Sequence, residues 1–464
     1  MRLGSAILAV VCLTACSTDR PGLSPVERPV IDNTVVQPNS QSVISALISA
    51  RVTHADSVRV RFHVAGSVGS DSLTPAVVPV QEAVNMPVLG LLPETHYVLR
   101  LEAFAARVTA SGESVDLITS QLPADLPSYT ASGTIRLVGF VVFAAGRYGL
   151  AIDRTGRVVW YRKFDGGPGL NFMAQPTGHY VARPPTGGPV ASAPWVEVDV
   201  LGNVTRTFGC ANGLTPRFHD LIELLDGSYW VMCDETRTMD LTSFGGVAEA
   251  HVTGTAIQHI GANGELLFHW SAFDHLSIDD LAPTDRTGAS VNWTHGNALD
   301  LDADGNLLVS FRSLDEITKI DAKSGAIMWR LGGRANQFTF IGAGTPPFAH
   351  QHGARLVDPS TLLLLDNLGD PLESRAERFV LDQSARMARL VQAYSSMPAV
   401  VTEIGGSVQP LADGRALVSF GTAGRVEMFD AANQMLWHVD GNPGYVFRAQ
   451  WIRSLYAPGI GSNR

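Results

Sequence analysis

The chain is short of charge, of cysteine and of long apolar runs, and each shortage excludes a class of protein. Only 17% of its 464 residues are charged, and the formal net charge is −10. An acidic chain offers no basic footprint for nucleic acid or for an anionic membrane surface, so we expect no nucleic-acid partner. Beyond the first residues, no apolar run is long enough to cross a bilayer as a helix.

The residues that are abundant indicate a folded, β-rich protein. Apolar residues make up 45% of the chain, and there are 45 glycines, a combination that suits tight turns and argues against disorder. A chain of this length exceeds one ordinary core, so we expect two domains and a leader.

The N-terminus carries the pattern of an export signal. A basic start and an apolar run from Leu3 to Val11 precede Leu13-Thr14-Ala15-Cys16, which resembles the lipobox of bacterial lipoproteins. This predicts a signal peptide over residues 1–15, a lipid on Cys16 as membrane anchor, and a tether over residues 16–29. By resemblance to bacterial sorting rules, Ser17 indicates the outer membrane, on its periplasmic or cell-surface side. The alternative is an ordinary signal peptide with an incidental cysteine.

Residues 30–123 are predicted to form a small β-sandwich. Apolar and polar residues alternate over Ser57–Val64, as in a strand with one buried face. The stretch Leu91–Leu101 resembles the fibronectin type III or immunoglobulin-like pattern, in which a tyrosine, here Tyr97, pins a corner near the start of a late strand. A Pro-containing linker follows.

Residues 130–464 read as a repeat. One unit, Asn297–Trp329, contains apolar strands, the hairpin signal Asp304-Gly305 and a terminal tryptophan, and the stretch Val408–Trp437 repeats this order. Units of about 45 to 60 residues with four short strands are propeller blades. We therefore predict an all-β chain with a six-bladed β-propeller after the sandwich; the alternative is a sandwich or a β-solenoid.

Two cysteines remain after the leader and the lipidated residue are set aside. Cys210 and Cys233 form an even pair in an oxidising compartment, which predicts a disulfide; the alternative is two buried thiols on neighbouring strands. Their spacing does not suit zinc, and we predict no metal site.

Histidines open the first strand of several units. His219, His295 and His352 stand at comparable positions, with His350 beside the last. Because the inner strands of a propeller face one axial channel, these side chains are expected to converge; the alternative is that they only cap blades. Arg312 ends the strand after His295, where its guanidinium is a candidate clamp for an anion.

Several of these residues lie in motifs that resemble those of the aryl-sulfate sulfotransferases. The resemblance covers about Gly133 to Leu455. The motifs, in order, are Trp293-Thr294-His295-Gly296-Asn297, Ser310-Phe311-Arg312, Trp329-Arg330-Leu331-Gly332-Gly333, Gln351-His352-Gly353-Ala354-Arg355, Asp366-Asn367 and Tyr445-Val446-Phe447-Arg448-Ala449.

The resemblance implies transfer of a sulfuryl group from a phenolic sulfate ester to a phenolic acceptor through a sulfohistidine, without nucleotide, metal or other cofactor. His352 matches the nucleophile, while His219, His295 and Arg312 match catalytic groups, and Asn297 and His350 are candidate substrate-binding residues. Two residues apart in a strand, His350 and His352 would share a face, so the choice between them rests on the motif. A histidine with a pKa near neutrality would then move the proton.

Two other functions stay open. One is a non-catalytic propeller lipoprotein that serves as a binding or assembly scaffold, and the other is a metal-dependent hydrolase or lyase. Convergence of the histidines with Arg312 favours an enzyme, whereas dispersal excludes one. The sequence leaves open the physiological donor and acceptor and the oligomeric state, with a homodimer as one alternative.

Overall fold

The computed structural model describes residues 27–67, 69, 71–135, 138–185, 193–411 and 414–459. The predicted leader, lipidated Cys16 and most of the tether therefore lie outside the described residues. Within the described residues, no helix is long and apolar enough to cross a membrane. The prediction of an all-β chain is confirmed, because eight antiparallel-rich sheets account for nearly all regular structure.

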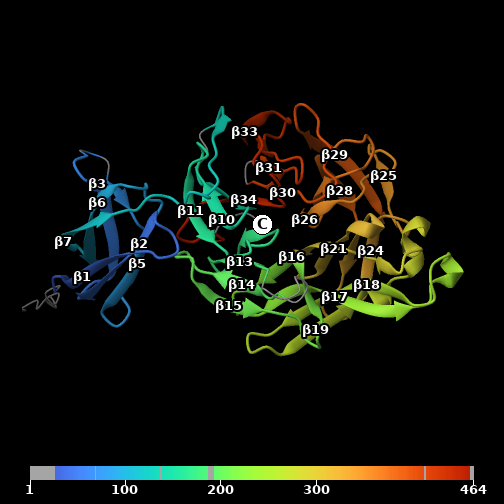
Figure 1. Ribbon diagram of the computed structural model, residues 1–464, viewed down its shortest axis with the longest axis horizontal. Helices are drawn as coiled ribbons and strands as arrows, with labels where there is room; N and C mark the ends of the chain where they lie inside the picture. Colours follow the sequence, from blue (N-terminus) through green and yellow to red (C-terminus); the bar gives the residue numbers. More distant parts are fainter. Residues whose placement is uncertain are drawn as a thin grey trace, which may run out of the picture.

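The first two sheets come from the N-terminal residues and form a lobe at one end of the molecule (Figure 1), and one apolar cluster continues from this lobe into the following sheets. One sheet has the order β1 (Val30–Pro38), β2 (Ser45–Thr53), β5 (Ala83–Leu89). The other has the order β4 (Ser72–Leu73), β3 (Ser57–Val64), β6 (His96–Ala105), β7 (Val108–Ile118). Alternate residues of β2, β3 and β6 fill one shared core, and the hydroxyl of Tyr97 accepts a hydrogen bond of 2.8 Å from the N–H of Leu92. Tyr97 therefore ties the loop before β6 to that strand.

Six further sheets follow in chain order and surround a common centre (Figure 1). The first three consist of β11 (Val158–Lys163), β10 (Tyr148–Ile152), β9 (Phe140–Ala145) and β34 (Ala449–Ile452); of β12 (Phe172–Ala174), β13 (Tyr180–Ala182), β14 (Trp195–Val198) and β15 (Val204–Phe208); and of β16 (Thr215–Glu223), β17 (Tyr229–Met239), β18 (Ala250–Ile260) and β19 (Leu266–Ser271), with β20 (Ser290–Asn292) parallel to β18.

The last three sheets complete the series. They consist of β21 (Gly296–Leu301), β22 (Leu307–Phe311), β23 (Glu316–Ile320) and β24 (Ile327–Gly332); of β26 (His352–Asp358), β27 (Thr361–Asp366), β28 (Arg375–Asp382) and β29 (Met387–Ser395), with β25 (Thr339–Ile341) parallel to β29; and of β30 (Ser407–Pro410), β31 (Ala416–Ser419), β32 (Val426–Phe429), β33 (Met435–Val439) and β8 (Ala131–Gly133). Among the described residues, helical structure consists of α1 (Ala272–His275) and short 3-10 turns at Thr242–Phe244, Ile278–Asp280, Pro283–Arg286 and Arg312–Leu314.

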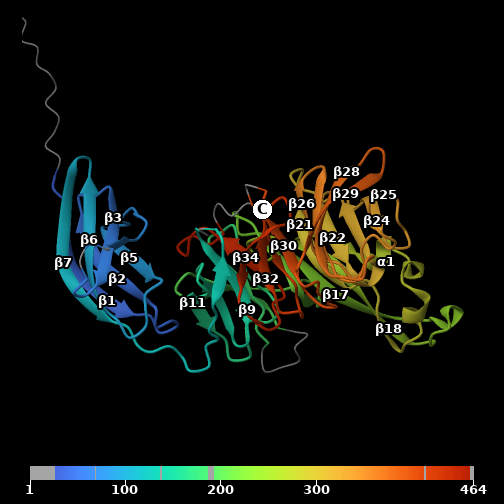
Figure 2. The same ribbon diagram turned by 90° about the horizontal axis from the view of Figure 1, so that it is seen from above.

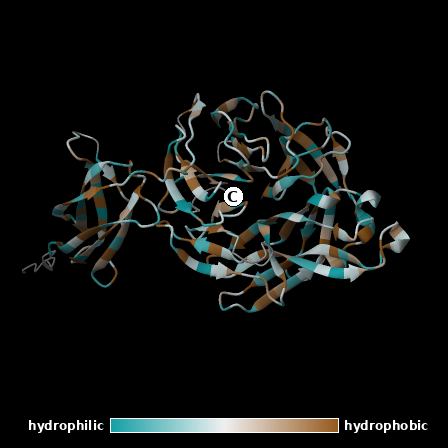
Figure 3. Cartoon of the chain, in the orientation of Figure 1, coloured by the Kyte–Doolittle hydropathy of each residue, from teal (hydrophilic) through white to brown (hydrophobic). Residues whose placement is uncertain are grey.

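Strands from the two ends of this region join its first and last sheets. β34, near the end of the chain, pairs with β9 in the first sheet, and β8, which precedes β9, pairs with β33 in the sixth. Each sheet shares an apolar core with the sheet before and after it, and the first also packs against the sixth. This arrangement is propeller-like, and Figure 3 shows hydrophobic residues along the strands of the sheets; Figure 2 gives the view from above.

Tryptophans explain the aromatic residue that ends several sequence repeats. Four tryptophans, Trp160 in β11, Trp270 in β19, Trp329 in β24 and Trp437 in β33, are almost fully buried. Each indole N–H donates to a turn of the next sheet around the ring. Trp160 donates to the carbonyl of Val200, Trp270 to that of Gly325, Trp329 to the side-chain oxygen of Gln383 and Trp437 to the carbonyl of Arg154. A buried indole N–H needs such a partner, so each tryptophan both fills a core and ties one sheet to the next.

Candidate functional site

His219 and His295 face each other at the centre of the six sheets. His219 lies in β16, where the pairing with β17 shifts register between Pro216 and Leu221, and it is 2% exposed. Its Nε2 is 3.3 Å from Nε2 of His295, and Arg217 Nε donates to its Nδ1 over 3.2 Å. Because Nδ1 accepts this bond, the neutral ring of His219 carries its proton on Nε2, toward His295.

His295 is held in an unusual backbone conformation. It stands just before β21 with a φ of 46°, and its carbonyl accepts the N–H of Arg312. Positive φ is rare for residues other than glycine and is most often retained at functional sites. A Cβ on the next residue, Gly296, would come within 2.7 Å of the Thr255 side chain, so only glycine fits there.

His352 begins β26 and is oriented by a buried amide. Its Nδ1 is 2.9 Å from Oδ1 of Asn367, and the amide nitrogen of Asn367 donates to the carbonyls of Thr402 and Gly405. These two bonds fix the orientation of the amide, so Nδ1 of His352 must donate, and Nε2 carries the lone pair. Of the described residues, Gly405 is the one whose donor faces Nε2, with its N–H at 3.3 Å.

Arg312 lies near His350 and forms no ion pair with a carboxylate among the described residues. Its guanidinium contacts Nδ1 of His350 at 3.1 Å and the carbonyl of Glu403 at 3.1 Å. Asp315 and Glu403 act on it only through their charge, and burial lowers its pKa. A half-buried guanidinium without an ion-pair partner favours binding of an anion.

His350 does not lie in a strand. It has a φ of 52°, its N–H donates to Asp315, and β26 begins only at His352. The expectation that His350 and His352 share one face of a strand was therefore wrong, because the left-handed turn at His350 separates them. The side chain of Asn297 in β21 donates to the carbonyl of Gln351, and its buried Oδ1 has no partner among the described residues.

Burial keeps the three central histidines neutral. It lowers the pKa of His352 to about 4, and burial together with Arg217 and Arg312 lowers the pKa of His295 to about 2. The pKa of His219 is also well below its ordinary value, again chiefly because of burial. The expectation of a histidine pKa near neutrality is wrong for these three, since burial is the largest cause of the shift at each of them.

Sequence reasoning missed four residues that complete the cluster. Arg217 forms an ion pair with Asp234 and orients His219, while Asn367 orients His352. The ring of Phe447 lies 5.7 Å from that of His219 and 6.0 Å from that of His352, and Gly405 faces Nε2 of His352. The motifs Asp366-Asn367 and Tyr445–Ala449 were the available signal for two of them.

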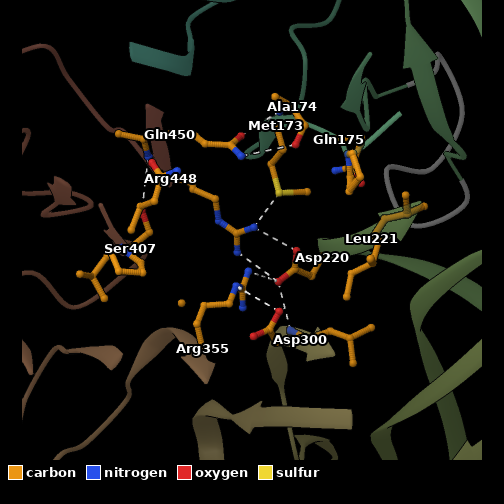
Figure 4. Close-up of a pocket in the computed structure, with 18 residues that line it drawn as sticks. Met173, Ala174, Gln175, Asp220, Leu221, Asp300, Arg355, Ser407, Arg448 and Gln450 are labelled. Atoms are coloured by element: carbon orange, nitrogen blue, oxygen red, sulfur yellow. Dashed lines mark hydrogen bonds and ion pairs between the residues drawn. The ribbon is translucent and has the colours of Figure 1, made fainter. Parts of the chain in front are cut away.

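A second polar group lies beside this cluster, around a cavity of about 150 Å³ (Figure 4). Asp220, the residue after His219, accepts from both terminal nitrogens of Arg448 at 3.0 and 3.1 Å and from Arg355 at 2.9 Å. Asp300 stands 4.0 Å from Arg355. This group is a balanced set of two arginines and two carboxylates.

Cys210 and Cys233 are joined in a disulfide. Cys233 lies in β17 and pairs with Pro216 of β16, three residues before His219, so the bond ties the strand next to His219 to the segment that follows β15. Among the described residues, no group of three or more His, Cys, Asp or Glu side chains is placed to hold a metal ion.

Comparisons with solved structures give distant matches. A protein of unknown function from Bacteroides caccae is 13% identical with a TM-score of 0.44, and the match covers 68% of this chain and 100% of that one. A streptogramin B lyase is 12% identical with a TM-score of 0.38, over 68% and 84% of the two chains. Virginiamycin B lyase from Staphylococcus aureus is 9% identical with a TM-score of 0.37, over 67% and 88%.

No curated protein matches the chain. One family model does, and the matched segment runs from the start of β16 to just beyond β33, so it contains His219, His295, Arg312 and His352. The resemblance seen in the sequence is thus confirmed: residues 215–442 match the arylsulfotransferase (ASST) family.

Proposed function

We propose that this protein transfers a sulfuryl group from a phenolic sulfate ester to a phenolic acceptor through a sulfohistidine at His352. The observation that carries the proposal is the state of His352. Burial keeps its ring neutral, and Asn367 fixes the tautomer so that Nε2 carries the lone pair. The described residues offer this lone pair one donor, the N–H of Gly405 at 3.3 Å. A neutral, oriented imidazole is a competent nucleophile.

The first half-reaction forms the N–S bond. Nε2 of His352 attacks the sulfur atom, the bond from sulfur to the phenolic oxygen breaks, and the phenolate leaves. Asn367 cannot accept the Nδ1 proton, so the sulfated ring stays cationic and remains a good leaving group for the second step. In that step the acceptor oxygen attacks sulfur, the N–S bond breaks and neutral His352 is restored.

Charge on the sulfuryl oxygens is matched by the surrounding cations and donors. Arg312 supplies a guanidinium without a counterion, and the N–H of Gly405 becomes available once Nε2 bonds to sulfur. Such donors act in the transition state much as they do in phosphoryl transfer.

Proton transfer falls to the pair His219 and His295. Their Nε2 atoms lie 3.3 Å apart, so the two rings face each other. Burial holds their pKa values low, but a bound sulfate ester brings negative charge, which favours the protonated ring. The pair would thus protonate the leaving phenolate and take the proton of the acceptor phenol.

The test is release of p-nitrophenolate from p-nitrophenyl sulfate with and without phenol. We expect release that depends on phenol, persists in the presence of a chelator and disappears in His352→Ala. Loss of activity on chelation would favour a metal-dependent hydrolase, and a folded protein inactive toward a panel of aryl sulfates would favour a scaffold.

The proposed architecture for this function is a sandwich over residues 30–123 and a six-bladed propeller over 130–464. Six sheets in chain order, six shared cores and the pairing of β34 with β9 support the blades. The sheet orders β1-β2-β5 and β4-β3-β6-β7, with Tyr97 bonded to the preceding loop, support an immunoglobulin or fibronectin type III-like sandwich.

The proposed location is the periplasmic or cell-surface side of the outer membrane, with a lipid on Cys16 at the start of a tether over residues 16–29. The basic start, the short apolar run and Leu13-Thr14-Ala15 before Cys16 support it. Labelling with a radioactive fatty acid tests this: we expect label in the full chain and none in Cys16→Ser.

A further inference from the structure

Three tyrosine hydroxyls are buried without a hydrogen-bond partner among the described residues. Two of them, on Tyr180 and Tyr394, belong to rings packed in the apolar cores between sheets. The third, on Tyr445, lies in the segment between β33 and β34, beside the histidine cluster. A buried hydroxyl without a partner costs stability, so one next to a binding site calls for an explanation.

Contacts through Gly405 place the Tyr445 hydroxyl near the nucleophilic nitrogen. A Cβ built on Gly405 would stand 2.7 Å from the hydroxyl oxygen of Tyr445 and 3.1 Å from the ring of Phe447. The N–H of the same Gly405 points at Nε2 of His352, at 3.3 Å. The N–H of Gly406 donates to the carbonyl of Phe447 over 2.9 Å, which holds the two segments together. The hydroxyl of Tyr445 and Nε2 of His352 thus both lie next to Gly405.

The Tyr445 hydroxyl can donate a hydrogen bond, but the groups named around it are donors rather than acceptors. Burial raises the pKa of Tyr445 to about 12, with Arg312 acting in the opposite direction, so the phenol keeps its proton at neutral pH. Arg312 is a cation and offers no lone pair, and the N–H of Gly405 is also a donor. An oxygen-rich anion held between these groups would supply the missing acceptor.

We propose that Tyr445 is a substrate-contacting hydrogen-bond donor that binds a sulfuryl oxygen of an aryl sulfate at the face of His352 lined by Gly405. The inference rests on the proposed function, since it names a further donor for the same site. It adds a neutral donor to the guanidinium of Arg312, so the oxygens of one sulfuryl group are held by groups from two different segments.

The test is Tyr445→Phe, which removes only the hydroxyl, with Tyr394→Phe as matched control. Loss of a hydrogen bond to a charged ligand should weaken binding of p-nitrophenyl sulfate by about 10- to 100-fold, measured by calorimetry with His352→Ala present in every variant so that no sulfuryl group is transferred. Turnover of the same donor with phenol, as kcat/KM, should fall at least as far. Tyr394→Phe should change neither quantity.

Thermal unfolding separates this role from a structural one. Removing an unpartnered buried hydroxyl should leave the Tm of Tyr445→Phe unchanged or higher, so a loss of binding cannot be ascribed to misfolding. A wild-type affinity in Tyr445→Phe would overturn the inference, as would equal losses in the two variants.

Binding and turnover also separate this inference from the proposed function. If the wild type binds p-nitrophenyl sulfate but transfers nothing, sulfuryl transfer fails while the affinity ratio still decides the role of Tyr445. If the wild type does not bind the ester at all, both are overturned.

Discussion

Two groups of buried polar residues lie next to each other along the inner strands, and they differ in charge balance. Around the cavity, two arginines face two carboxylates, with Asp220 bonded to both Arg448 and Arg355. In the histidine cluster, the hydrogen bonds of the Arg312 guanidinium within the described part of the chain go to a histidine nitrogen and a carbonyl, and burial keeps the three central histidines neutral. One residue step, from His219 to Asp220, leads from one group to the other.

This difference in charge balance indicates that the group around the cavity stabilises the fold, whereas the histidine cluster is suited to binding a ligand. The balanced group satisfies its own charges, so it needs no ligand and holds the inner strands together. The histidine cluster keeps a cation and a buried hydroxyl without a partner among the described residues, and an anionic ester would supply both with an acceptor; the lone pair of His352 Nε2 accepts only a long bond from the N–H of Gly405 in the part of the chain that the structure describes. Natural sequences retain such unsatisfied groups chiefly where a site requires them.

The largest expected effect is a loss of stability when one carboxylate is removed from the group of two arginines and two carboxylates around the cavity. Asp220→Asn removes the carboxylate shared by Arg448 and Arg355, leaving buried cations uncompensated, and should lower the free energy of unfolding by about 3 to 5 kcal/mol. Urea denaturation measures it. The exposed Asp226→Asn is the control and should change little; an equally small effect of Asp220→Asn would refute the structural role of this group.

Arg312→Gln should do the opposite, lowering activity while leaving stability nearly unchanged. Because Arg312 has no carboxylate partner, its loss should leave stability nearly unchanged, while kcat/KM for p-nitrophenyl sulfate should fall by about 10²- to 10³-fold, as for loss of one oxyanion donor. Arg448→Gln serves as comparison and should destabilise the fold, since it leaves Asp220 short of a partner. Strong destabilisation by Arg312→Gln would contradict the distinction between the two groups.

Asn367→Ala probes the orientation of the nucleophile. Without the amide oxygen, the ring of His352 loses both its fixed tautomer and its direction, so kcat should fall by about 10- to 100-fold with little change in KM. Asn336→Ala, which also removes an amide bonded to backbone groups but far from any histidine of the cluster, should leave kcat unaltered. A rise in KM alone would show that Asn367 shapes binding rather than the attacking ring.

The smallest expected effect is the change of kcat/KM as His352 becomes protonated in acid. His352 must be neutral to attack, and burial lowers its pKa to about 4, so the loss of kcat/KM on the acid side of the pH profile should set in only as pH falls through about 4. Tryptophan fluorescence must show that the fold persists at each pH. A decline centred near the ordinary histidine value of about 6.5 would mean that the ring is not desolvated as the structure has it.

The sequence predicted the repeat and the histidines because both follow from local patterns. Period-two alternation, Asp-Gly turns and terminal tryptophans are visible in short windows, and the order of the motifs pointed to His352 and Arg312. Tyr445 and Arg217 could not be assigned a role in this way, since their part depends on contacts with Gly405 and with Asp234 and His219.

Two local expectations failed for physical reasons. The left-handed turn at His350 breaks the strand that would have placed it beside His352. The histidine pKa values depend on how completely the neighbouring sheets remove water, and that burial is a property of the assembled fold rather than of any motif.

The most direct measurement of the central claim is the location of the sulfuryl group. The protein is mixed with p-nitrophenyl sulfate without acceptor, quenched in alkali, digested and analysed by mass spectrometry. The account predicts one sulfuryl group on the peptide that contains His352, lost when phenol is added before the quench. Release of nitrophenolate with no such adduct, or with the group on another residue, would contradict it.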